Sequence, residues 1–173
     1  DGFYGIPLSK WLPYSVARTW HIQIGLFWIA TAWLAAGLFI GPLVSNREPA
    51  GQRFGVNVLF IALLVVVVGS LAGEWLSVKN FLTDEVSFYL GHQGYEYVDL
   101  GRVWQIGLMI GLLLWLVLML RALWPALKGE GDQKQLVLLL AVSTGAIALF
   151  YGAGLTWGQH THLTIVEYWR WWV

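Results

Sequence analysis

Residues 21–44 read HIQIGLFWIATAWLAAGLFIGPLV and contain no Lys, Arg, Asp or Glu. At about 1.5 Å per residue, a helix over this run would be roughly 36 Å long, enough to cross a hydrocarbon core of about 30 Å with some tilt. Because an open sheet edge cannot satisfy its backbone hydrogen bonds in lipid, we expect the run to be helical. The Gly41-Pro42 pair predicts where this helix ends.

Three further apolar runs, at 54–76, 103–120 and 136–157, are long enough to span a membrane, and another helix is expected to start at about 165–173. The spacings Gly69-x-x-x-Gly73 and Gly107-x-x-x-Gly111 are typical of membrane helices that pack closely. The sequence therefore predicts an all-α, polytopic transmembrane helix bundle. Residues 1–173 are expected to be a single transmembrane segment of a larger domain, and a fragment of a longer polypeptide.

Composition supports a membrane protein and excludes several other classes. The hydrophobic set makes up 58% of the 173 residues, charged residues make up only 12%, and the formal net charge is zero. A neutral chain with so few charges has no basic field for nucleic acid. Because the chain has no cysteine, it has no disulfide framework, thiolate metal site or iron–sulfur cluster. Any metal must therefore be bound by histidine, carboxylate or backbone oxygen.

Twelve tryptophans in so short a chain are a second membrane signature. Most lie near the ends of the apolar runs, where amphipathic rings prefer the headgroup level: Trp11, Trp20, Trp75, Trp124, Trp157, Trp169, Trp171 and Trp172. Three lie deeper, at Trp28, Trp33 and Trp115.

His21 is the histidine most suggestive of a cofactor. It lies at the start of the first run, where an imidazole is costly to bury without a partner. A haem iron would be such a partner, and Arg18 could then meet a propionate. Composition alone favours the alternative of an interfacial histidine that is hydrogen-bonded to a carbonyl. On a helix, the residues on the His21 face would be Gly25, Trp28, Ala32 and Ala35. The small residues on this face, glycine and alanine, would let a planar macrocycle approach the helix backbone.

The other three histidines are weaker candidates. His160 and His162 follow the fourth run at a spacing that could bind a metal from a loop or strand, but does not place both on one helix face. A solvated pair is the favoured interpretation. His92 lies in the loop before the third run and is expected to be exposed.

Two acids near run ends have competing interpretations. Glu96, between Tyr95 and Tyr97, offers oxygen ligands for a hard cation, although one acid cannot build a site alone. The favoured alternative is an acid that stabilises the start of the third helix through the helix dipole. Glu74 is expected to reach the outer headgroup region, with a proton path as the less favoured alternative.

Orientation is weakly determined, because Lys and Arg divide evenly between the two sides that four spans define. The connections 45–53 and 121–135 are shorter than the segments on the other side, so their basic residues are more concentrated, and we place these connections in the cytoplasm.

Five ordered strings are distributed along the chain: RTWHIQ at 18–23, FWIATAWLAAG at 27–37, VVVVGSLAGEW at 65–75, GHQGYEY at 91–97 and EYWRWWV at 167–173. Together they resemble the catalytic subunit of bacterial quinol-dependent nitric oxide reductases, within the haem–copper oxidase superfamily. The resemblance implies a multi-pass protein of the bacterial cytoplasmic (inner) membrane with about 12–14 helices. It also implies a low-spin haem b, a centre of high-spin haem b and non-haem iron, and reduction of nitric oxide to nitrous oxide.

The resemblance also assigns roles to individual residues. His21 matches an axial ligand of the low-spin haem, Glu96 matches a ligand of a calcium ion that bridges the haem propionates, and Phe3 resembles the lip of the quinol pocket. In the family, a His-x-x-x-Glu pair of iron ligands would follow just beyond Val173, so we expect this segment to lack the reaction centre. The expected partners are quinol, nitric oxide, the lipid bilayer, the remainder of the same polypeptide and, as one possibility, a second copy in a homodimer.

Two other functions remain open at this point. One is a self-contained membrane cytochrome b, in which His21 and either His160 or His162 clamp a haem between the first and fourth spans. The other is a structural or assembly subunit that needs no cofactor.

Overall fold

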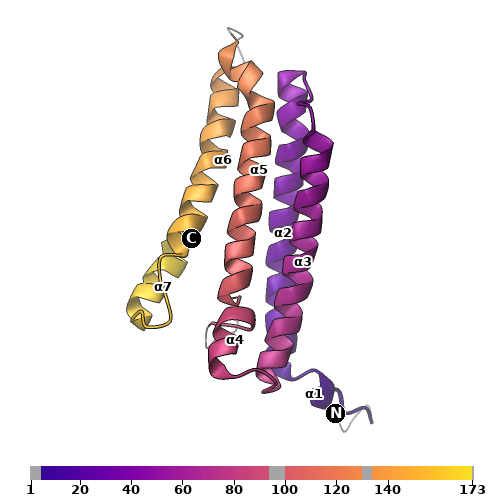
Figure 1. Ribbon diagram of the computed structural model, residues 1–173, viewed down its shortest axis with the longest axis vertical. Helices are drawn as coiled ribbons and strands as arrows, with labels where there is room; N and C mark the ends of the chain where they lie inside the picture. Colours follow the sequence, from indigo (N-terminus) through magenta and orange to yellow (C-terminus); the bar gives the residue numbers. More distant parts are fainter. Residues whose placement is uncertain (1–4, 94–99, 130–133, 173) are drawn as a thin grey trace. The chain divides into compact units, whose positions relative to one another are not determined.

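The computed structural model describes residues 5–93, 100–129 and 134–172. Its four long helices are α2 (Tyr14–Ser45), α3 (Gln52–Val78), α5 (Arg102–Lys128) and α6 (Lys134–Gly154), and its short ones are α1 (Leu8–Trp11), α4 (Asp84–Leu90) and α7 (Leu163–Trp172) (Figure 1). The described residues contain no strand, only an isolated bridge between His92 and Leu100. The predicted all-α class is therefore confirmed.

Each of the four long helices is long and apolar enough to cross a membrane. They contain the predicted apolar runs and extend beyond them, except that α6 ends at Gly154, before the predicted end at 157. The length and hydropathy of these helices identify an integral, multi-pass membrane protein.

The predicted end of the first helix at Gly41-Pro42 is wrong, because α2 continues through Pro42 to Ser45. Asn46 then adopts the left-handed conformation, with a φ of 50°. Its backbone N–H donates to the Leu43 carbonyl, and the N–H of Arg47 donates to the Pro42 carbonyl. These two bonds satisfy the last carbonyls of the helix in a Schellman arrangement, so Asn46 rather than the proline ends α2.

The chain divides into two compact units, Asp1–Thr31 with Leu64–Ile106 and Ala32–Leu63 with Gly107–Val173. In the first unit, Trp20 Nε1 of α2 donates to the Leu71 carbonyl of α3 at 3.1 Å. Two further bonds tie α1 to the end of α3, from Trp75 Nε1 to the Trp11 carbonyl and from Lys79 Nζ to the Lys10 carbonyl, each at 2.8 Å.

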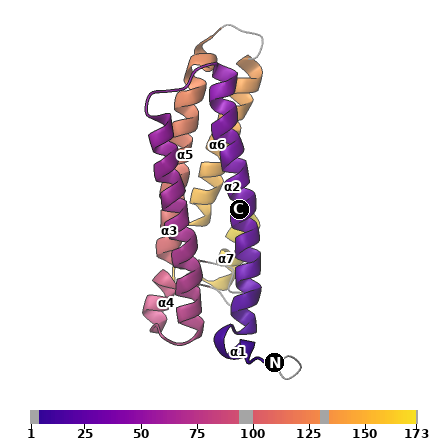
Figure 2. The same ribbon diagram turned by 90° about the vertical axis from the view of Figure 1, so that its right-hand side faces the viewer.

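Glycines allow α4 and the start of α5 to pack tightly on α3. A Cβ on Gly73 would overlap the Leu90 carbonyl oxygen, and one on Gly69 would overlap the indole ring of Trp104. Trp104 Nε1 in turn donates to the Leu90 carbonyl at 2.7 Å. The predicted Gly69-x-x-x-Gly73 packing motif therefore contacts the Trp104 ring of α5 and the C-terminal end of α4 at Leu90. Figure 2 shows α4 beside the C-terminal part of α3.

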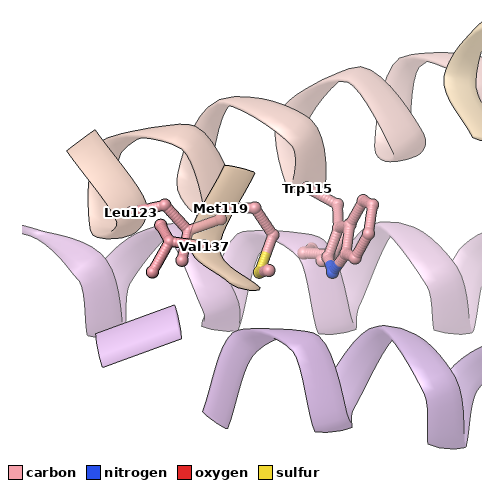
Figure 3. Packing of buried hydrophobic residues seen from close by; sticks show 5 residues of the cluster. Trp115, Met119, Leu123 and Val137 are labelled. Carbon is pink, nitrogen blue, oxygen red and sulfur yellow. The ribbon is translucent and has the colours of Figure 1, made fainter. Parts of the chain in front are cut away.

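The second unit has an apolar core between its helix segments. Its buried residues are Leu59, Trp115, Met119, Leu123 and Val137, four of which are labelled in Figure 3. Trp115 also stacks on Trp33, with ring centroids 5.7 Å apart. Two of the three deep tryptophans thus stack on one another, with Trp115 buried and Trp33 still partly exposed, whereas Trp28 is exposed.

Candidate haem-binding site on α2

His21 lies on the exposed side of the first turns of α2, and its neighbours Thr19 and Gln23 lie on the buried side. This division follows from the helical period, because residues two positions apart point to nearly opposite faces. The same helix segment is positioned by the Trp20–Leu71 hydrogen bond. The imidazole is therefore presented outward, away from the side of α2 that carries the buried Thr19 and Gln23.

The surface beside His21 is open. Gly25, one turn further along α2, has no atom within 4 Å of the position that a Cβ would take, and Trp28 on the next turn is exposed. Arg18, one turn before His21, is exposed as well. An imidazole, a bare glycine and a basic side chain on one helix face fit the edge and the acidic groups of a haem. Ala32 and Ala35, which belong to the second unit, are also exposed.

His162 has a structural role that the sequence analysis missed. It is exposed and precedes α7, and its Nδ1 accepts a hydrogen bond from the backbone N–H of Thr164 at 3.2 Å. A neutral imidazole that accepts at Nδ1 carries its proton on Nε2, so neither nitrogen then offers a free lone pair to a metal. This geometry favours His162 as the N-terminal cap of α7.

His160 is exposed in the same turn, which Thr161 closes by accepting from the Gly158 N–H at 2.9 Å. His21 belongs to the first unit and both of these histidines to the second. A haem shared between them therefore stays an untested alternative.

Two predicted site residues, Phe3 and Glu96, lie outside the described residues. Within the described ranges, no group of three or more His, Asp or Glu could hold a metal ion. The calcium ligand at Glu96 and the quinol contact at Phe3 therefore stay predictions.

The expectation that Glu74 reaches the headgroup region is wrong. Glu74 is only 1% exposed, and it lies inside α3, which continues to Val78. The carboxyl turns toward α2, where Thr19 is 1% exposed. Thr19 and Gln23 were not among the predicted site residues, although their spacing of four residues next to a candidate ligand marks one helix face.

His92, expected to be exposed, is half-buried and lines a pocket at the end of α3, together with Ser77, Asp84 and Ser87. This pocket is separate from the His21 face, since Ser77 and His21 lie on different helices and no His21 atom lines it.

A comparison with known protein families matches residues 4–173 to cytochrome c and quinol oxidase polypeptide I. No curated protein matches the chain. The matched residues include His21 and almost the entire sequence. The chain therefore belongs to the cytochrome c and quinol oxidase polypeptide I family, the subunit I of haem–copper oxidases, a family of membrane oxidoreductases that bind haem.

Proposed function

We propose that this chain is part of a quinol-dependent nitric oxide reductase and supplies one axial ligand of its low-spin haem b. Membership of a haem-binding oxidase family supports the redox function. The observation that carries the site is the outward-facing His21 beside the open backbone of Gly25. The five strings quoted above favour nitric oxide over oxygen as the electron acceptor.

In this proposal the chain's own residues bind and orient the group. An imidazole nitrogen of His21 would hold the iron, Gly25 would leave room for the ring edge, and Arg18 would pair with a propionate. When bound, haem supplies one-electron transfer, while the protein sets its ligation and surroundings. The Trp20–Leu71 bond keeps this part of α2 in place, so the ligand is positioned before haem binds.

The same proposal assigns the remaining groups of the enzyme. Quinol would deliver electrons near Phe3, and calcium would bind through Glu96. The high-spin haem b and the non-haem iron would be held by other parts of the polypeptide. Nitric oxide would be reduced there to nitrous oxide and water, in the cytoplasmic membrane of a bacterium.

The ligand assignment is tested with His21→Ala in the full-length protein. We expect the low-spin haem absorption bands and quinol oxidation to be lost, with the high-spin haem retained. The matched control is His160→Ala, an exposed histidine in the same chain, which should keep both haem signals. An intact low-spin spectrum in His21→Ala would show that another residue is the ligand. Loss of that spectrum in His160→Ala would favour the cytochrome b alternative.

The acceptor is tested separately on the purified wild-type protein with a reduced quinol. We expect nitric oxide consumption with formation of nitrous oxide, and much slower oxygen consumption. Dominant oxygen uptake would place the protein among the oxidases of the same family and remove the nitric oxide assignment. Metal analysis of Glu96→Gln tests the calcium site, with loss of calcium as the expected result.

A further inference from the structure

Glu74 is a buried carboxyl that the proposed function does not use. Neither of its carboxylate oxygens has a hydrogen-bond partner among the described residues. Thr19 of α2 is close enough to interact with the carboxyl, yet no hydrogen bond of normal geometry joins the two, and Thr19 Oγ1 is likewise unsatisfied. A bare carboxylate in an apolar interior is costly, and a water molecule or a proton would reduce that cost. We therefore expect Glu74 to bind a proton, a water molecule or both.

Polar side chains flank Glu74 on its own face of α3, and one of them, Ser77, lies toward the end of the helix. Ser70, Glu74 and Ser77 are spaced i, i+4 and i+7, so they lie on one side of the helix, within a sector of about 60°. Ser70 is fully buried, and its hydroxyl donates to the Val67 carbonyl of its own helix at 3.1 Å. Ser77 is 8% exposed, and its hydroxyl contacts the hydroxyl of Ser87 in α4.

Ser77 also lines an open pocket at this end of α3. The polar residues around that pocket are Ser77, Asn80, Asp84, Ser87 and His92. Ser77 is in the last turn of α3, Asp84 and Ser87 are in α4, and Asn80 and His92 lie in the connections on either side of α4. Ser77 thus lines the open, polar pocket and also lies on the same face of α3 as the buried, unsatisfied carboxyl of Glu74.

We propose that this pocket and Ser77 admit water to Glu74, and that Glu74 binds and releases a proton there. A hydronium ion in the pocket gives its proton to the carboxylate, which leaves a neutral carboxylic acid and a water molecule, and the reverse step returns the proton. Asp84 and His92 are the ionisable groups that line the pocket. The other charged or ionisable groups nearby are Lys79, whose ammonium donates to the Lys10 carbonyl, and Arg18 and His21, which are exposed on α2. The α2 residue on the Glu74 side, Thr19, is buried and does not ionise. The route does not depend on which acceptor the enzyme reduces.

Water access is tested by thiol labelling, for which the absence of native cysteines in this chain is convenient. Ser77→Cys and Glu74→Cys are made singly in the full-length protein, free of other cysteines, and treated in membrane vesicles with a hydrophilic thiosulfonate. The control is Val66→Cys, which is similarly buried on α3 but lies two turns deeper. We expect both test positions to react at least about tenfold faster than the control, since the reagent needs a hydrated thiolate. Equal rates at all three positions would refute the route.

Proton binding is tested by infrared spectroscopy of the full-length protein. We expect Glu74→Gln to remove one protonated-carboxyl C=O band that shifts in D2O, and Glu74→Asp to retain such a band. Ser77→Ala should slow the deuterium shift of this band severalfold. Ser70→Ala, on the side of Glu74 away from the pocket, should leave the shift unchanged. A Glu74→Gln spectrum identical to that of the wild type, or an unchanged exchange rate in Ser77→Ala, would overturn the proposal. Neither readout involves haem or nitric oxide, so this inference and the proposed function can fail independently.

Discussion

The indole nitrogen of Trp115 donates a hydrogen bond to the backbone carbonyl of Leu34, with a donor–acceptor distance of 3.0 Å. Trp115 is only 2% exposed, and it reaches the backbone of α2 because residue 37 is glycine: a Cβ on Gly37 would lie 2.9 Å from its ring. A buried indole N–H needs such a partner, since lipid offers none. This contact therefore joins α5 to α2 inside the second unit.

Trp115→Phe should lower the free energy of unfolding by about 0.6–1.5 kcal/mol, because it removes one interhelical hydrogen bond and keeps a stacked ring. The measurement is reversible unfolding of the full-length protein in mixed micelles. Trp33→Phe is the matched control, because it keeps the same stacked pair and removes none of the hydrogen bonds described. Equal losses in the two variants would show that the indole–carbonyl bond contributes little.

Gly73→Ala should destabilise the first unit by roughly 1–3 kcal/mol, because the new methyl group would overlap the backbone oxygen of Leu90 and α4 would have to move. Gly145→Ala is the control, since nothing lies within 4 Å of a Cβ there. Alanine is the better helix former, so that variant should be neutral or more stable by up to about 1 kcal/mol. Thermal unfolding of the two full-length variants makes the comparison. A stable Gly73→Ala protein would contradict the packing described here.

The number and approximate position of the four long apolar helices could be predicted from sequence, because both follow from the thickness and polarity of the bilayer, whereas the short helices α1 and α4 were not predicted. The run at 21–44 is apolar over a length that only a spanning helix explains, and it lies within α2. The helix end was harder to predict. Gly41-Pro42 is a reasonable stop signal, but the left-handed backbone of Asn46 ends the helix, with the N–H of Asn46 donating to the Leu43 carbonyl and that of Arg47 to the Pro42 carbonyl.

The direction in which a side chain faces was the least predictable feature. Glu74 lies close to the end of an apolar run, which favours a headgroup position, yet packing turns it inward. That rotation depends on where α2 and α4 contact α3, which no local pattern encodes. His21 was a candidate because its residue type and position were both unusual. Its exposure, in contrast, depends on which side of α2 packs against α3.

The membrane orientation proposed from basic residues can be tested with single cysteines. Glu48 and Glu85 are both exposed, in the connection after α2 and in α4, and one spanning helix separates them along the chain. We expect Glu48→Cys to react with an impermeant thiol reagent from the cytoplasmic side and Glu85→Cys to react from the opposite side. Labelling intact cells and inverted vesicles in parallel measures both. The reverse pattern would invert the orientation, and labelling of both residues from one side would remove α3 as a span.

His162 provides the sharpest test between a structural and a ligand role. If it caps α7, His162→Asn should preserve the cap, because an asparagine side chain accepts the same kind of hydrogen bond, and should leave the haem spectrum unchanged. His162→Ala should lose about 0.5–2 kcal/mol of local helix stability, seen as faster amide exchange at the start of α7, with the haem spectrum still intact. A haem ligand behaves differently, because neither asparagine nor alanine replaces an imidazole on iron. Loss of a haem band in both variants would therefore assign His162 to the metal and revive the cytochrome b alternative.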